Sequence, residues 1–217
     1  MRPKAIVFDL DGVLWNSNSI HELAFMDVLR NTSNQDIEFI YAEYAGMKTI
    51  DVFRKLFPNA SPAHLDSMCR KKQMLASKRL NNSDDIVNNE LNEVLLSLVG
   101  KFTLGICTSS RRENLQIFLE KSKSAHFFTA MITSEEVANA KPDPEIYLRI
   151  TREFNLHPNQ IMVVEDSIQG VISAKLAGNS VAHLCEKNCK INHQDVIFAD
   201  VLVINTLKSL PRLLDLV

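Results

Sequence analysis

The sequence lacks an excess of charge of either sign. Among its 217 residues, 24 Lys and Arg stand against 26 Asp and Glu, which gives a formal net charge of −2. Proteins that bind nucleic acids or anionic membranes over a broad area need a basic surface, so this balance argues against both as partners. It still leaves room for a small cationic pocket.

Long apolar runs are missing as well. Runs such as Val94–Leu96 are far shorter than the ~20 residues of a membrane-spanning helix. The chain reaches Asp9 before the apolar segment of a secretory signal peptide could form, so we expect a cytoplasmic location. Cysteine is scarce, with 4 residues, and these are expected to be reduced thiols in that compartment.

Apolar residues make up 46% of the sequence, which is enough for a hydrophobic core. They follow two different patterns along the chain. Residues 4–8 form a short strand-like run, whereas residues 17 to about 82 show helical periodicity almost throughout. Four amphipathic helices are predicted there, near residues 23–29, 37–44, 50–56 and 63–80. Ser61 and Pro62 are typical of the N-cap and the first position of the last of these helices.

From residue 91 onward, helices and strands alternate. Strands are predicted at 102–107, 130–133, 161–164, 181–184 and 201–204, and helices at 91–98, 112–121, 144–154 and 168–176. Such alternation predicts an α/β fold, a Rossmann-like three-layer core with a parallel sheet. The helical region then becomes a small α-helical cap inserted after the first strand, with residues 1–15 and 85–217 forming the core domain and residues 16–84 the cap domain.

Polar residues follow four of the predicted strands. They are Asp9 and Asp11, Thr108–Ser110, Lys141–Pro144, and Glu165 with Asp166. Because the carboxyl ends of parallel strands meet at one edge of a sheet, we expect these residues to converge. Each motif alone also has an ordinary explanation, as a solvated turn, a helix N-cap or a loop lysine, but their joint occurrence favours a site.

The chemistry of these residue types is specific. Crowded carboxylates raise each other's pKa unless a cation lies among them. Oxygen ligands with open positions suit Mg²⁺, which keeps waters and accepts phosphate oxygens. A hydroxyl, the backbone amides of a glycine-containing turn and a lysine are groups that bind phosphate. The residues therefore predict Mg²⁺-assisted phosphoryl transfer.

In order and spacing, the four motifs resemble those of the haloacid dehalogenase (HAD) superfamily. They read Asp9-Leu10-Asp11-Gly12-Val13-Leu14, Thr108-Ser109-Ser110, Lys141-Pro142-Asp143-Pro144 and Glu165-Asp166-Ser167. Within the superfamily, the chain resembles the capped phosphatase branch, with phosphoglycolate-phosphatase-like and β-phosphoglucomutase-like relatives.

The resemblance implies a catalytic role for several motif residues. Asp9 would be the nucleophile that forms an aspartyl-phosphate, and Asp11 the general acid that later acts as a base. The Thr108 hydroxyl and the Ser109 backbone amide would bind the phosphoryl group, and Lys141 would neutralise its charge. Dehalogenases of the superfamily lack the second aspartate, so its presence disfavours dehalogenation.

The same resemblance implies a metal site. Mg²⁺ would be held by the Asp9 carboxylate, the Asp11 backbone carbonyl and Asp166. Glu165 would act on the ion directly or through a bound water.

Three residues of the cap are candidates for substrate contacts. His21 lies where mutase-like relatives also carry a histidine, and a surface histidine on an amphipathic helix is the alternative. Lys48 lies in a loop that resembles the specificity loop of capped relatives and could meet a distal anion. Lys72 could supply a second cation, although the run Arg70–Lys72 also fits a solvated helix face.

A second metal site is conceivable around His183, Cys185, Cys189 and His193. The spacing of these residues matches no standard zinc pattern, so surface or packed side chains are the preferred interpretation.

Together these observations predict a Mg²⁺-dependent phosphatase that hydrolyses a small phosphorylated metabolite, either a sugar phosphate or a phosphoglycolate-like acid. One alternative is phosphoryl transfer of the β-phosphoglucomutase type, which is disfavoured because no arginine stands at Lys48-Thr49. Another is a non-catalytic binding protein on a HAD scaffold, which would have no need for Asp11. The physiological substrate is not fixed by the motifs, and a monomer is the default oligomeric state.

Overall fold

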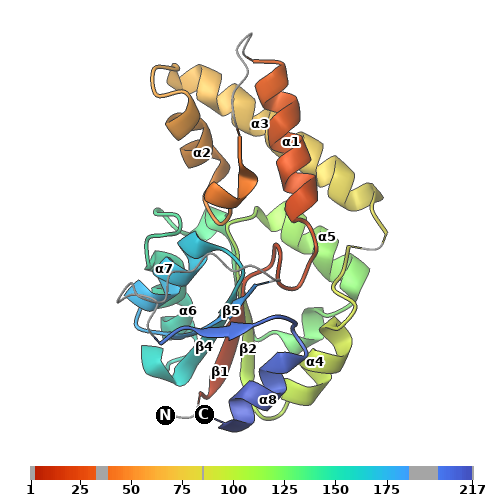
Figure 1. Cartoon of the computed structure of the whole chain (residues 1–217), viewed down its shortest axis with the longest axis vertical. Coiled ribbons are helices and arrows are strands. Elements are labelled where there is room, and N and C mark those ends of the chain that lie inside the picture. Colours follow the sequence, from red (N-terminus) through yellow and green to blue (C-terminus); the bar gives the residue numbers. More distant parts are fainter. Residues whose placement is uncertain (1–2, 33–38, 85, 186–199, 217) are drawn as a thin grey trace.

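A six-stranded sheet forms the centre of the molecule in the computed structural model, which describes residues 3–32, 39–84, 86–185 and 200–216 (Figure 1). The strands are β1 (Ala5–Phe8), β2 (Thr103–Cys107), β3 (Ala130–Ile132), β4 (Ile161–Glu165), β5 (Ser180–Leu184) and β6 (Leu202–Ile204). They run parallel in the order β3-β2-β1-β4-β5-β6. The α/β fold predicted from the sequence is confirmed.

The first strand lies in the middle of this sheet. Ala5 of β1 is paired with Thr103 of β2 on one side and with Ile161 of β4 on the other. Both β1 and β4 are buried along their whole length, which explains why neither shows polar alternation. The carboxyl ends of these two strands are therefore fixed side by side in the interior of the fold.

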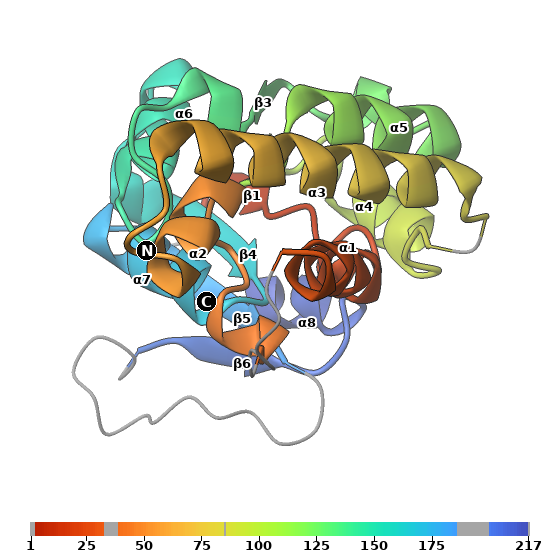
Figure 2. The same ribbon diagram turned by 90° about the horizontal axis from the view of Figure 1, so that it is seen from above.

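Helices cover both faces of the sheet (Figure 2). One face packs on α4 (Leu91–Leu98), α5 (Arg112–Ser122) and α8 (Ser209–Leu216), and the other on α6 (Glu145–Glu153) and α7 (Ile168–Leu176). Alternate residues of β1 serve the two apolar cores, with Ile6 in one and Val7 in the other. Among the described residues, none of the helices has both the length and the apolar character needed to cross a bilayer.

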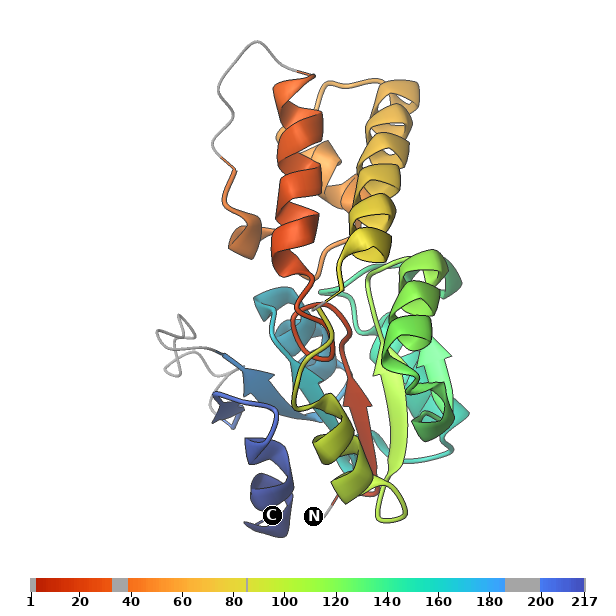
Figure 3. The same cartoon turned by 90° about the vertical axis from the view of Figure 1, so that its right-hand side faces the viewer.

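A group of helices between Asn18 and Asn82, called the helical insert below, stands above the carboxyl edge of the sheet (Figure 3). It contains α1 (Asn18–Arg30), α2 (Thr49–Leu56) and α3 (Pro62–Asn82). Ser61 caps α3 by accepting a hydrogen bond from the backbone N–H of His64. The insert has an apolar core of its own, built around Phe25 and Phe53, whose ring centroids are 5.3 Å apart.

The helix predicted over residues 37–44 is wrong for the part of it that the structure describes. Only a short 3₁₀ turn, Tyr41–Glu43, is present there, and residues 37 and 38 lie outside the described part. Aromatic packing explains the difference, because the Phe39 ring stacks on Tyr44 at 5.2 Å and also contacts Phe25. Tertiary contacts have overridden the local helical pattern.

Two chain segments connect the insert to the rest of the molecule, and they are hydrogen-bonded to each other. Trp15 and Val87 form an antiparallel bridge. The N–H of Asn16 donates to the carbonyl of Ile86 at 2.7 Å, and that of Asn88 donates to the carbonyl of Leu14 at 3.1 Å. The insert therefore leaves and rejoins the core at one place.

Candidate active site

A buried ion pair network lies at the carboxyl edge of the sheet, just beyond β1 and β4. Lys141 Nζ donates to Asp9 Oδ1 at 2.6 Å and to Glu165 Oε1 at 2.5 Å. Its side chain is 1% exposed. Burial alone would lower the pKa of Lys141, but the two carboxylates outweigh burial and raise it. Lys141 is thus held as a permanent cation between two acids.

Glu165 is fixed on both of its oxygens. Besides Lys141, Oε1 accepts from the hydroxyl of Tyr147 at 2.6 Å, and Oε2 accepts from the hydroxyl of Ser167 at 3.0 Å. The side chain is fully buried. These contacts hold Glu165 in place beside the lysine, and Tyr147 is a member of the site that was not predicted from the sequence.

A cluster of three carboxylates fits a divalent cation. Oxygens of Asp9, Glu165 and Asp166 lie within 4.8 Å of one another, and among the described residues this is the one group of acids, His or Cys with such an arrangement. Burial and the neighbouring carboxylates raise the pKa of Asp9 well above its ordinary value and that of Asp166 to about 7. Oxygen donors with uncompensated negative charge are what Mg²⁺ prefers.

The turn after β1 is shaped around this cluster. Gly12 has a positive φ of 82°, and a Cβ atom there would lie 1.9 Å from Asp166 Oδ2. Any other residue at this position would displace the Asp166 carboxylate, so the glycine is required by both its backbone conformation and the close approach.

Asp11 accepts three hydrogen bonds. The donors are the hydroxyls of Ser17 and Ser110, each at 2.5 Å, and Nε2 of His21 at 3.0 Å. Burial would raise the pKa of Asp11, but His21 and the two hydroxyls outweigh burial and lower it. This arrangement stabilises the carboxylate form of Asp11. Ser110 belongs to the motif that was predicted to converge on this edge, although no role was assigned to it. Ser17 was not predicted to take part, because it becomes a neighbour of Asp11 only through the tertiary fold.

A buried chain of hydrogen bonds extends from Asp11 into the insert. Lys72 Nζ lies 2.9 Å from His21 Nδ1 and 4.4 Å from the centre of the Phe25 ring. An ammonium group can only donate, so Nδ1 of His21 is the acceptor and Nε2 carries the proton that is donated to Asp11. His21 and Lys72 are 4% and 5% exposed, which excludes the alternatives of a surface histidine and a solvated helix face.

Two further predicted residues connect the insert to the core. The hydroxyl of Ser109 donates to the carbonyl of Gly46 at 2.5 Å, and Lys48 Nζ donates to the carbonyl of Val137 at 2.8 Å. Lys48 therefore contacts a core loop. Thr108 is fully buried, and its hydroxyl oxygen accepts a hydrogen bond from the N–H of Ser110 at 3.0 Å.

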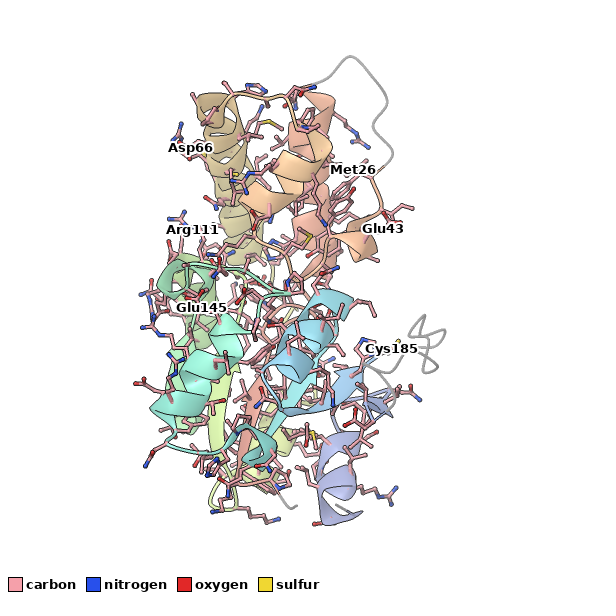
Figure 4. All side chains as sticks on the ribbon, turned by 90° about the vertical axis from the view of Figure 1, so that its left-hand side faces the viewer. Met26, Glu43, Asp66, Arg111, Glu145 and Cys185 are labelled. Atoms are coloured by element: carbon pink, nitrogen blue, oxygen red, sulfur yellow. The ribbon has the colours of Figure 1, made fainter. Side chains whose placement is uncertain are left out.

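A cavity of about 570 Å³ lies between the insert and the sheet edge. Asp9, Asp11, Asp166, His21, Lys48, Lys72 and Ser109 of the predicted residues line it, whereas Thr108, Lys141 and Glu165 lie behind its wall. Asp66 of α3 and Arg111, the residue before α5, also line the cavity and lie on the same side of the molecule (Figure 4). The volume suits a small metabolite.

The structure describes two of the four residues of the possible zinc site, His183 and Cys185. His183 Nε2 donates to the backbone carbonyl of Asp166 at 2.9 Å. Cys185 directly follows β5, whereas Cys189 and His193 lie outside the described residues.

Sequence comparisons agree with the motifs. A model of the haloacid dehalogenase-like hydrolase family matches residues 6–184. The chain is 27% identical to a phosphorylated carbohydrates phosphatase of Thermotoga maritima over 81% of this chain and 82% of that protein. It is also 27% identical to the pyrophosphatase PpaX of Bacillus cereus, over 84% of this chain and 83% of that protein.

Solved structures agree on the fold. A β-phosphoglucomutase of Clostridium difficile is similar with a TM-score of 0.80 at 16% identity, over 96% of this chain and 93% of that one. At this identity the likeness concerns the fold alone. Because the family model spans most of the sequence and all four motifs, the chain belongs to the haloacid dehalogenase-like hydrolases, as its motifs indicated.

Proposed function

We propose that the protein is a Mg²⁺-dependent phosphatase that hydrolyses a small phosphorylated metabolite by way of an aspartyl-phosphate on Asp9. The observation that carries this proposal is that Asp9, Asp11 and Asp166 line one cavity. Lys141, which does not line the cavity, donates a hydrogen bond to Asp9. Pairs of acids placed in this way suit phosphoryl transfer to a carboxylate and release of the phosphate by water.

In the first step, an Asp9 carboxylate oxygen forms a bond to phosphorus while the bond from phosphorus to the ester oxygen breaks. Asp11 gives its proton to that leaving oxygen. The free site lowers the pKa of Asp11 and stabilises its carboxylate form. The negative charge of an arriving phosphoryl group would act in the opposite direction and favour the protonated form that this step needs. In the second step, Asp11 accepts a proton from the water that attacks phosphorus and frees Asp9.

The remaining core residues would bind the metal ion and the phosphoryl group and keep the reacting groups in position. Asp9, the backbone carbonyl of Asp11 and Asp166 would hold Mg²⁺, which balances the carboxylates and draws charge from the phosphoryl oxygens. Both oxygens of Glu165 already accept hydrogen bonds, so we propose that its main role is to hold Lys141 in place. Any contact of Glu165 with the ion would be made through a water. Thr108 and the Ser109 amide would bind the phosphoryl group.

The helical insert would act as a cap that closes the cavity and excludes water. His21, Lys48 and Lys72 would contribute to the substrate side of the site. Lys72 has no carboxylate within ion-pair distance among the described residues, so its charge is available to an anionic or polar substrate.

A sugar phosphate is the substrate class that the cavity favours. Rings of Phe25, Tyr41 and Tyr44 line it beside the polar groups, and burial together with the catalytic carboxylates raises the pKa of Tyr41, which keeps its hydroxyl protonated as a donor. Aromatic rings with polar neighbours suit a polyhydroxylated ring better than a bare pyrophosphate. Such substrates agree with the cytoplasmic location expected from the sequence, and we retain a monomer as the working state.

The first experiment measures phosphate release with Mg²⁺ across a panel of phosphorylated sugars, phosphoglycolate and pyrophosphate. Asp9→Asn is expected to abolish release while circular dichroism shows a folded protein. The matched control is Asp84→Asn, because Asp84 is 97% exposed and distant in sequence from every motif, and it should retain parental activity. Full activity of Asp9→Asn, or of the parent in excess EDTA, would remove the nucleophile and metal assignments.

The mutase alternative is tested with β-glucose 1-phosphate and a bisphosphate primer. A phosphatase releases phosphate from the sugar, whereas a mutase forms glucose 6-phosphate. Formation of glucose 6-phosphate in place of free phosphate would contradict the proposal.

A further inference from the structure

Asn18, the first residue of α1, makes a contact that the roles above do not use. Its side-chain Nδ2 donates to Asp166 Oδ2 at 2.7 Å, between residues 148 positions apart in the sequence. Asn18 belongs to the helical insert, whereas Asp166 follows β4 at the sheet edge. The insert therefore touches the carboxylate cluster itself, in addition to its contacts with Asp11.

This contact is packed against the turn that follows β1. A Cβ atom on Gly12 would lie 1.9 Å from Asp166 Oδ2 and 2.4 Å from Asn18 Nδ2. The Asn18 amide, the Asp166 carboxylate and the Gly12 backbone thus form one close junction. Three segments meet there, and a shift of any one of them would move the Asp166 carboxylate.

Asp166 is held from the core as well, through its backbone. His183 of β5 is 3% exposed and donates from Nε2 to the Asp166 carbonyl at 2.9 Å. The core therefore fixes the main chain of Asp166, and the insert fixes Oδ2 of its side chain. Neither of these two hydrogen bonds uses Oδ1 of Asp166.

Hydrogen-bond donors to ligand carboxylates orient them, and replacing such donors typically weakens metal affinity about 10–100-fold. We propose that Asn18 is a positioning residue for the divalent cation, one that makes metal affinity depend on the insert being seated on the core. By linkage, a bound cation in turn holds the start of α1 against the sheet edge. The inference rests on the proposed function, since it takes the Asp9, Glu165 and Asp166 cluster as the metal site.

The direct test measures Mn²⁺ binding to the metal-free protein, with the electron paramagnetic resonance signal of free Mn²⁺ as the readout. Mn²⁺ is suitable because oxygen ligands accept it as well. Asn18→Leu keeps nearly the same side-chain size and removes the donor, and we expect its Kd for Mn²⁺ to rise about tenfold. Asn18→Ala, which adds no bulk, should behave alike if the leucine variant folds poorly. Asn31→Ala is the matched control, because Asn31 lies just beyond the other end of α1 and donates to the Asp27 carbonyl.

A second readout separates positioning from a merely structural role. Amide hydrogen exchange over residues 18–22 is measured with and without Mn²⁺. In the parent and in Asn31→Ala, the metal should slow exchange at the start of α1. In Asn18→Leu, exchange at the start of α1 should be the same with saturating metal as without it. If Asn18 had only a structural role, the substitution would instead change exchange by the same factor with and without metal, and the metal would still slow it.

The possible outcomes are distinct. Unchanged Mn²⁺ affinity in both Asn18 variants overturns the inference and leaves the phosphatase proposal intact. A parent protein that binds no Mn²⁺ or Mg²⁺ overturns both. A parent that binds Mn²⁺ with the expected dependence on Asn18, but releases phosphate from no ester, supports the inference and removes the proposed function.

Discussion

Two buried lysines near the catalytic carboxylates, one in the core and one in the helical insert, have opposite electrostatic surroundings. Lys141 lies between Asp9 and Glu165, at 2.6 and 2.5 Å, and its pKa is raised. Lys72 is equally buried, but its polar partner is the neutral ring nitrogen of His21, and burial lowers its pKa to about 8. The same side chain is thus a structural counter-ion in one region and an uncompensated charge in the other.

The difference shows how the two regions divide their tasks. In the core, Lys141 is already paired with Asp9 and Glu165 before any substrate arrives, which fixes these groups in place. In the insert, a charge is kept without an anionic partner and at a cost in stability, which is expected where a ligand supplies the missing partner. The comparison therefore predicts that removing either lysine harms activity, with opposite effects on stability.

The largest effect is expected for Lys141→Met. This substitution leaves Asp9 and Glu165 as unpaired buried acids, and breaking a buried pair in this way costs about 3–5 kcal/mol of unfolding free energy. We also expect kcat/KM to fall about 10³-fold, because charge at the transferring group is no longer neutralised. Urea unfolding and phosphate release measure the two effects. Lys208→Met, which breaks the exposed pair with Glu93, is the control and should change either value little.

An intermediate effect is expected for Lys72→Met, with stability moving the other way. The folded pKa of Lys72 is lowered to about 8 from 10.5, so the folded state binds fewer protons between these values and parental stability rises with pH across this window. At pH 7 the buried charge costs stability, and methionine should raise the free energy of unfolding by about 1–2 kcal/mol. This gain should vanish by pH 10.5.

The same variant should lose about tenfold in kcat/KM, the value of one charged contact. Exposed Lys71 provides the matched control, Lys71→Met, in which neither stability nor activity should change. Urea unfolding of all three proteins at pH 7 and pH 10.5 gives the comparison. If Lys72→Met were less stable than the parent at pH 7, the charge of Lys72 would be stabilised by its surroundings in the insert, as the charge of Lys141 is in the core.

The smallest effect is expected for Lys48→Met. Lys48 donates to the Val137 carbonyl and so ties the loop before α2 to the core. The net value of one such hydrogen bond, about 1 kcal/mol, should raise KM about two- to fivefold through a less closed cavity, with kcat nearly unchanged. Lys55→Met, on the exposed side of α2, is the control for the assay. A loss of kcat/KM of about tenfold, as expected for Lys72→Met, would place Lys48 among the groups that contact the substrate.

How much could be predicted from the sequence differs between the regions for a physical reason. Core positions such as Asp9 and Asp166 follow apolar strands, and the edge of a parallel sheet brings strand ends together whatever the details of packing. By contrast, Ser17 and Asn18 follow no strand, and they acquire their partners only when separate segments pack. No local periodicity encodes such contacts.

Helices show the same contrast. The boundaries of α4, Leu91–Leu98, were predicted from an amphipathic pattern, whereas α8, Ser209–Leu216, was not predicted although it has the same length, because a proline stands within it. In the insert, aromatic contacts of Phe39 and Tyr44 replaced a predicted helix with a 3₁₀ turn. Patterns predict elements that bury one face, and they fail where a few large rings determine the path of the chain.

The bridge between Trp15 and Val87 has a consequence for how such a protein can change over generations. Because the chain leaves the core and returns to it at one hydrogen-bonded place, the stretch between can be lengthened, shortened or exchanged without rerouting the sheet. Under the proposed division of tasks, changes within this stretch would mainly alter substrate contacts, whereas the four motifs lie outside it. Selection can act on one while leaving the other in working order.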